Sequence, residues 1–195
     1  MGKQPTFQEA NISCIEEFHW CVYADGFFRA AEILVYNLRS TYEANTVVFP
    51  IVFLYRQYLE LSLKEIIAYG RFLEESQHGT PQSHDLKGLW NEAKTCINKH
   101  IENVDKNEVK KIEGVVLEMH ALDPTSEASR YPIVKKRQYA DKTASFSQGP
   151  THINLPELAE RMRIVSTFFH NATSILSVSQ DLAAEYRNDN SVLEW

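Results

Sequence analysis

The sequence predicts an all-α protein, a bundle of four to five helices with a long central helix and an irregular or hairpin-like insertion before the last helix. Apolar residues recur at three- and four-residue spacing over most of the chain, which is the period of an amphipathic helix. Only seven Gly and seven Pro occur in 195 residues, too few for the many tight turns of a sandwich or barrel. The length fits one domain covering residues 1–195.

Two long helices are expected in the first half of the chain. The first should span about residues 15–40, because Phe27, Phe28, Ala31, Leu34, Val35 and Leu38 share one face. The second should run from about residue 42 or 45 to Gly70, with fraying towards residue 73, and is apolar on most of its circumference. It is therefore the predicted central helix, and Pro50 should either kink it or start a new segment.

Three further helices follow a polar loop at residues 74–84. A helix over 86–100 should be capped by Ser83 or Asp85, and another over 107–120 should end at Asp123-Pro124. Residues 129–154 lose the helical period and are expected to be irregular, with at most one short hairpin. The last helix should begin near Leu155-Pro156 and end near residue 187.

The net charge and the cysteines argue against several classes of protein. The formal charge of −6 argues against a protein coated with nucleic acid, although a local basic patch could still bind phosphates. The three cysteines, Cys14, Cys21 and Cys96, cannot all pair within the chain and lack zinc-site spacing. We found neither a signal peptide nor an apolar run of membrane-spanning length. A cytoplasmic protein without membrane contact is therefore expected.

The last expected helix carries a candidate pair for phosphate chemistry. Its apolar face comprises Leu155, Leu158, Met162, Val165, Phe169, Ala172 and Leu176, widened by Phe168 and Ile175. Arg163 and His170 lie seven residues apart, so they differ by about 20° around the axis and about 10 Å along it. Short hydroxyl side chains surround them. An imidazole can act as general acid or base near neutral pH, and a guanidinium stabilises phosphate charge. The alternative is two ordinary solvated residues.

A second polar cluster is expected on the central helix. Arg56, Glu60 and Lys64 are successive i, i+4 neighbours in a mostly apolar segment. Charges in such a helix must be paired or face a cleft. A structural row of ion pairs is the simpler interpretation. His84 is expected in solvent, and the alternative has it completing the cluster with Glu60.

A basic and aromatic stretch precedes the last helix. It contains Arg130, Tyr131, Lys135, Lys136 and Arg137. Cations and rings in alternation suit single-stranded RNA, with phosphates on the cations and bases on the rings. The alternative is a solubilising loop.

The sequence contains none of the other common catalytic or nucleotide-binding motifs. We found no GxSxG, P-loop, GxGxxG or HExxH pattern. Glu16 with His19 and Glu75 with His78 have the Glu-x-x-His spacing of di-iron bundles. The second pair falls in the polar loop, so neither a metal nor another cofactor is expected.

Together these segments resemble the HEPN superfamily (higher eukaryotes and prokaryotes nucleotide-binding), a group of small all-helical domains. The resemblance rests on four parts: residues 55–64 (YRQYLELSLK), His84-Asp85-Leu86, Arg130-Tyr131-Pro132, and Arg163 with His170. The family's nuclease signature is an Arg, four to six residues, and a His, and here six residues lie between Arg163 and His170.

The resemblance implies a homodimer in which two Arg-His pairs line one cleft and cut RNA without a metal, in a toxin–antitoxin or antiphage system. It also implies RNA or a nucleotide as ligand and a cognate antitoxin or defence partner. Family nucleases usually carry a polar residue directly after the Arg, where this chain has Ile164. The alternative is therefore a non-catalytic HEPN-like module for dimerisation or for binding a nucleotide or partner.

Overall fold

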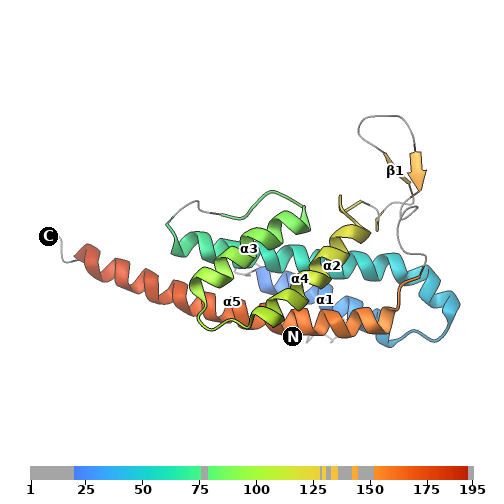
Figure 1. The fold of residues 1–195 in the computed structure, drawn as a ribbon, viewed down its shortest axis with the longest axis horizontal. Coiled ribbons are helices and arrows are strands. Elements are labelled where there is room, and N and C mark those ends of the chain that lie inside the picture. The colour runs from blue at the N-terminus through green and yellow to red at the C-terminus, as the bar shows by residue number, and fades with distance from the viewer. Residues whose placement is uncertain are drawn as a thin grey trace, which may run out of the picture.

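The fold is an all-α bundle, as predicted (Figure 1). The computed structural model describes residues 20–75, 79–127, 129–130, 133–135, 142–144 and 152–192. These residues form, in chain order, α1 (Trp20–Tyr36), α2 (Thr41–Leu73), α3 (Leu86–His100), α4 (Lys106–Leu122), β1 (Ile133–Lys135), β2 (Lys142–Ala144) and α5 (Leu155–Val192). The expected helix boundaries hold to within a few residues, apart from the part of the first helix that lies before residue 20.

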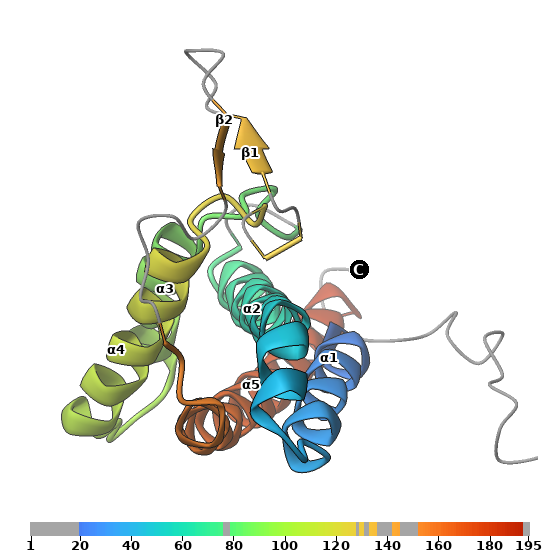
Figure 2. The same cartoon turned by 90° about the vertical axis from the view of Figure 1, so that its right-hand side faces the viewer.

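The central helix is α2, as its nearly all-round apolar sequence predicts. It contacts α1, α3, α4 and α5, and the end view shows the other helices arranged around it (Figure 2). Pro50 lies inside α2, so it does not start a new segment. Gly70 does not end the helix, which continues to Leu73.

Polar side chains fix where the helices begin. The Ser40 hydroxyl accepts a hydrogen bond from the backbone N–H of Glu43 at the start of α2. Asp85, one of the two expected caps, accepts from the N–H groups of Lys87 and Gly88 at the start of α3. Asp105 caps α4 in the same way. These carboxylates and hydroxyls satisfy backbone donors that have no partner within their helix.

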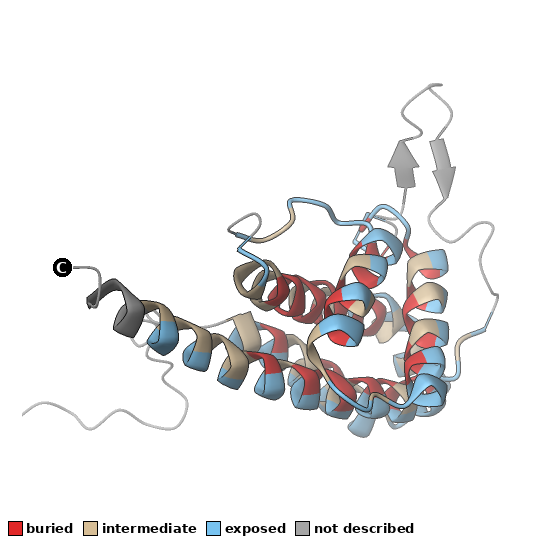
Figure 3. Cartoon of the chain, turned by 60° about the vertical axis from the view of Figure 1, so that its left-hand side comes forward, coloured by how far each residue is buried: buried red, intermediate tan, exposed pale blue. Residues whose placement is uncertain are grey.

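The inward face of α5 is the one that the sequence predicts. Its seven expected core residues are all buried, and Phe169 packs against Tyr58 of α2 and Trp90 of α3. Ile175, expected to widen this face, is instead 46% exposed. Buried positions line the first part of α5 and are missing from its C-terminal part, which extends beyond the bundle (Figure 3). Ile175 lies before this extension, since its neighbour Leu176 is fully buried. It is exposed because it lies about 100° around the helix axis from Leu176 and the inward face.

The insertion before α5 contains one short hairpin. Strands β1 and β2 pair antiparallel, with Ile133 opposite Ala144 and Lys135 opposite Lys142. Within the described segments, no helix is both long enough and apolar enough to cross a membrane.

Candidate functional site

Arg163 lies on α5 and bridges to α1. Its side chain is 51% exposed, its Nε donates to Glu32 at 2.6 Å, and its Nη1 donates to Glu160 at 2.9 Å. The hydrogen bonds and charges of these two carboxylates raise the pKa of Arg163 above its ordinary value. Two carboxylates on one guanidinium leave a local charge of about −1, which repels a phosphate until one of them moves away.

Glu32 is the residue at this site that the sequence did not point to. One of its oxygens accepts from Arg163, and the other accepts from the Tyr55 hydroxyl at 2.5 Å. Burial, and then the hydrogen bond to Glu32, raise the pKa of Tyr55. Glu32 therefore connects three helices, α5, α1 and α2, through one carboxylate.

His170 is exposed on the same helix. In the segments that the structure describes, its ring makes no hydrogen bond. The hydroxyls near it are turned back on their own helix: Thr167 donates to the carbonyl of Arg163 at 3.1 Å, and Thr173 to those of Phe169 and His170 at 3.0 and 3.1 Å. Such back-bonding is common for hydroxyl residues within helices. Short polar side chains surround the pair, but the hydroxyls of Thr167 and Thr173 already donate hydrogen bonds to carbonyls of their own helix.

The structure brings together all four residues of the predicted polar cluster. Glu60 Oε2 accepts from Arg56 Nη1 at 3.0 Å, while Oε1 accepts from Lys64 at 3.0 Å and lies 2.7 Å from His84 Nδ1. Arg56, Glu60 and Lys64 are buried, whereas the His84 side chain is 67% exposed. Both expectations for His84 thus hold in part, since its ring faces solvent while Nδ1 contacts Glu60.

Arg56 joins this cluster to two loops. Its Nη2 donates to the carbonyl of His84 at 2.7 Å, and its Nε to the carbonyl of Asp123 at 3.0 Å. The Asp123 carboxylate in turn accepts from Ser129 at 2.5 Å through the hydroxyl and at 3.2 Å through the N–H. Arg56 therefore ties α2 to the start of α3 and the end of α4, which is the structural role that the sequence analysis favoured.

The charge of Glu60 is stabilised by this arrangement. Burial alone would raise the pKa of its carboxyl, but hydrogen bonds from Lys64, His84 and Arg56 outweigh burial and hold the pKa below the ordinary value of 4.5. Glu60 is thus an ionised, hydrogen-bonded group at neutral pH. A buried carboxylate held this way stabilises the fold more readily than it exchanges protons.

The basic stretch is described only in part. Arg130 Nε donates to the carbonyl of Ser126 at 2.5 Å, which places it beside the loop that Asp123 organises. Lys135 belongs to β1. Tyr131, Lys136 and Arg137 lie outside the described residues, so the RNA-binding role of this stretch remains a prediction.

Comparison with known proteins gives no relative. No family model, no curated protein and no solved structure matches the chain.

Proposed function

We propose that the protein is a HEPN-like, metal-independent RNA endonuclease that acts as a homodimer in a toxin–antitoxin or antiphage system. One observation carries this proposal: Arg163 and His170 are both exposed on one long helix, two turns apart. A rigid helix holds a cation and an imidazole at a fixed separation of about 10 Å along its axis, close enough for both side chains to reach one phosphodiester.

The proposed reaction uses the RNA itself as nucleophile. The 2′-hydroxyl attacks the adjacent phosphorus, the P–O5′ bond breaks, and the product carries a 2′,3′-cyclic phosphate. His170 transfers protons between the attacking and leaving oxygens, and Arg163 stabilises the charge on the phosphoryl oxygens. In this proposal Arg130, Tyr131, Lys135, Lys136 and Arg137 position the strand.

Cleavage requires that Glu32 release Arg163. Glu32 accepts from Arg163 through one oxygen only, whereas a phosphate offers the guanidinium two oxygens, so the exchange replaces a single hydrogen bond by a paired contact. The active form is then the RNA-bound one, with Arg163 turned from α1 towards the strand. The second copy in the dimer would supply the second Arg-His pair of the cleft.

The test is cleavage of labelled RNA by purified, metal-free protein in EDTA. We expect His170→Ala and Arg163→Ala to lower the cleavage rate at least about 100-fold, the usual contribution of a proton-transfer group or charge-stabilising donor. Arg161→Ala is the matched control, because Arg161 also lies on α5 and pairs with an exposed carboxylate, Glu118, at 2.5 Å. Its cleavage rate should equal that of the wild type.

Two results would contradict the proposal. The first is no cleavage of any RNA by the wild-type protein, and the second is equal cleavage by the wild type and His170→Ala. Circular dichroism of each variant separates loss of chemistry from loss of fold, since both substituted side chains are exposed.

A second candidate is a non-catalytic HEPN-like module that dimerises or binds a nucleotide or partner protein. It is favoured by the two carboxylates on Arg163 and by an exposed apolar stripe on α5. The stripe consists of Ile164, Ile175, Val178, Leu182 and Tyr186. Most of these positions follow the alternating three- and four-residue spacing of a helix-pairing seam, and Asn171 occupies one position of the same seam.

The stripe and the Arg-His pair lie on different sides of α5. At 100° per residue, Ile164 and Leu182 are about 100° around the axis from Arg163. Pairing of two α5 helices through the stripe would therefore leave Arg163 and His170 at the edge of the interface. Sedimentation of wild type and Leu182→Glu tests this seam, and a dimer that needs Leu182 but cuts no RNA would favour the second candidate.

A further inference from the structure

The imidazole of His84 has one nitrogen on a buried carboxylate, while the rest of its ring faces solvent. Nδ1 lies 2.7 Å from Oε1 of Glu60, and the His84 side chain is 67% exposed. Among the residues that the structure describes, none makes a hydrogen bond with Nε2. Nε2 is therefore the nitrogen that a ligand arriving from solvent meets.

Glu60 determines which of the two nitrogens carries the proton. Burial opposes its ionisation, but hydrogen bonds from Lys64, His84 and Arg56 hold the pKa of its carboxyl below the ordinary value of 4.5. An ionised carboxylate only accepts hydrogen bonds, so the neutral imidazole carries its proton on Nδ1 and its lone pair on Nε2. A carboxylate orients the histidine of a catalytic triad in the same way. The lone pair makes Nε2 a base and a nucleophile.

The charges around this ring favour an uncharged reaction partner. Arg56 and Lys64 are buried, and both bond to Glu60 at 3.0 Å. Asp85 directly follows His84, and its side chain is 52% exposed. A phosphate or another anion approaching Nε2 is therefore repelled by Asp85, whereas an uncharged electrophile is not.

Three other histidines each lack one of the two features of His84. His100 Nε2 lies 3.4 Å from Glu74, and His120 Nδ1 lies 3.3 Å from Asp85. Both contacts are longer than that of His84, and the two side chains are only 17% and 25% exposed. His170 is exposed, but its ring has no carboxylate partner in the described segments.

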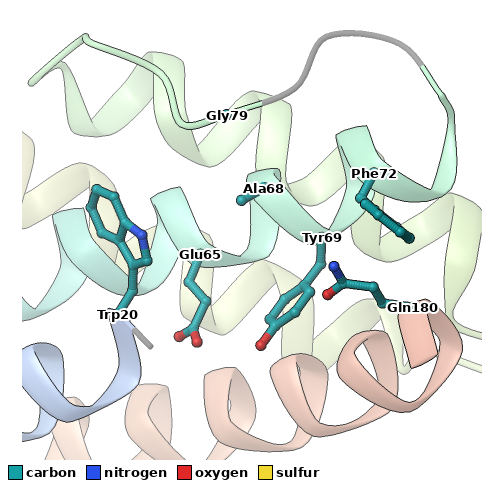
Figure 4. A pocket seen from close by; sticks show the side chains of 7 residues that line it. All are labelled: Trp20, Glu65, Ala68, Tyr69, Phe72, Gly79 and Gln180. Atoms are coloured by element: carbon teal, nitrogen blue, oxygen red, sulfur yellow. The ribbon is translucent and has the colours of Figure 1, made fainter. Parts of the chain in front are cut away.

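The described thiols and the cavity between α1, α2 and α5 offer weaker nucleophiles. Burial raises the pKa of the Cys21 thiol, and it raises that of Cys96 to about 11. A thiol reacts as its thiolate, so both are poorly reactive at neutral pH. The cavity has a volume of about 300 Å³, and its described lining contains no histidine, cysteine or lysine (Figure 4). Burial also raises the pKa of the phenol in this lining, Tyr69.

We propose that His84 is a catalytic nucleophile that hydrolyses activated, uncharged esters through an acyl group on Nε2, with Glu60 as its positioning residue. Nε2 attacks the ester carbonyl, the N–C bond forms, and the C–O bond breaks with its electron pair going to the leaving oxygen. The ring keeps its proton on Nδ1 and becomes a cation, which Glu60 stabilises. Water then attacks the acyl carbon, the C–N bond breaks, and the acid and one proton are released. This activity is independent of the RNA cleavage proposed for Arg163 and His170.

Hydrolysis of p-nitrophenyl acetate by the full chain tests the proposal, with the release of p-nitrophenolate as the signal. We expect His84→Gln to lower the rate above the spontaneous reaction at least about tenfold. His100→Gln is the matched control, because His100 is also next to a carboxylate but is mostly buried, and its rate should be that of the wild type. Circular dichroism confirms that each variant is folded.

Two measurements on the wild type need no variant. Diethyl pyrocarbonate is an uncharged acyl donor, and mass spectrometry should show that it modifies His84 at least about tenfold faster than the exposed His170. Long-range proton–nitrogen NMR should place the proton of neutral His84 on Nδ1, which tests the positioning role of Glu60 directly.

Four results would each overturn the proposal. They are equal rates of ester hydrolysis by the wild type and folded His84→Gln, equal rates for the wild type and folded Glu60→Gln, modification of His170 as fast as that of His84, and a proton on Nε2 of neutral His84. The last two hold even where Glu60→Gln unfolds.

Discussion

Glu32 on α1 accepts a 2.6 Å hydrogen bond from Arg163 on α5, across 131 positions of sequence. The guanidinium that we assign to the scissile phosphate therefore already has a carboxylate partner in this structure. Any anion that binds Arg163 competes with Glu32. The same contact also holds the first and last helices of the described bundle together, so it couples ligand binding to the packing of α1 on α5.

Replacing Glu32 by Gln should strengthen RNA binding. The amide keeps the size of Glu32 and one acceptor oxygen but removes its charge, so phosphate displaces it more easily. Because exposed ion pairs contribute about 0.2–1 kcal/mol, we expect RNA affinity to rise by a factor of up to about five. Fluorescence anisotropy with labelled single-stranded RNA at fixed ionic strength measures this change.

The matched control is Glu118→Gln, which removes the carboxylate from Arg161 on the same helix. It makes an equal change in net charge, so any general electrostatic gain appears in both variants. Equal RNA affinities of the two variants would show that Glu32 does not compete with RNA for Arg163.

Replacing Arg56 by Met should destabilise the fold strongly. Arg56 is fully buried, and its removal leaves Glu60 with fewer partners and two loop carbonyls, those of His84 and Asp123, without this donor. Breaking a buried pair from one side commonly costs about 3–5 kcal/mol. Urea unfolding measures the loss, and Arg161→Met should lose at most about 1 kcal/mol because its ion pair is near the surface. Similar losses in both variants would contradict the structural role of Arg56.

The contribution of Glu60 should disappear in acid. Its pKa in the folded protein lies below the ordinary value of 4.5, so ionisation of Glu60 stabilises the fold above that value. This contribution is lost as the pH falls through the lowered pKa, because the folded state must then take up a proton that it binds weakly. We expect the free energy of unfolding to differ most between wild type and Glu60→Gln at pH 6–7, and the difference to shrink steadily below about pH 4.5.

Urea titrations of both proteins from pH 7 to pH 3 provide this comparison. Other carboxylates titrate in both proteins and cancel in the difference. A difference that stays constant over the whole range would mean that the charge of Glu60 contributes nothing to stability.

The sequence predicted those features that depend on local spacing. The inward face of α5 and the Arg56–Glu60–Lys64 row follow from helical geometry, because positions three and four apart are neighbours on any α-helix. The Asp85 cap follows from a carboxylate directly before an apolar period. The contact of His84 with Glu60 could be stated only as an alternative, since the two residues are 24 positions apart in the sequence and a loop lies between them.

The remaining contacts depend on packing between distant segments. Glu32 gave no signal because nothing in its neighbourhood in α1 marks it as a partner for Arg163. Asp123 was expected only to end α4, yet its carbonyl accepts from Arg56 and its carboxylate accepts from Ser129. No rule of sequence spacing predicts the contacts of Glu32 or Asp123, because these contacts depend on which helices and helix ends meet in the bundle.

Gly70 is a third example: the sequence left open whether the helix ends there or continues to residue 73, and in the structure it continues. Gly70 lies within α2 against α3, where an added Cβ would be 2.7 Å from the Cβ of Cys96. We expect Gly70→Ala to lose about 1–3 kcal/mol by overpacking, more than the gain of about 1 kcal/mol that Ala normally brings to a helix. Gly114→Ala on α4 is the control, because a Cβ there meets nothing within 4 Å, and it should gain stability. Thermal or urea unfolding of both variants decides the point: a Gly70→Ala protein as stable as Gly114→Ala would mean that α2 and α3 do not approach each other this closely.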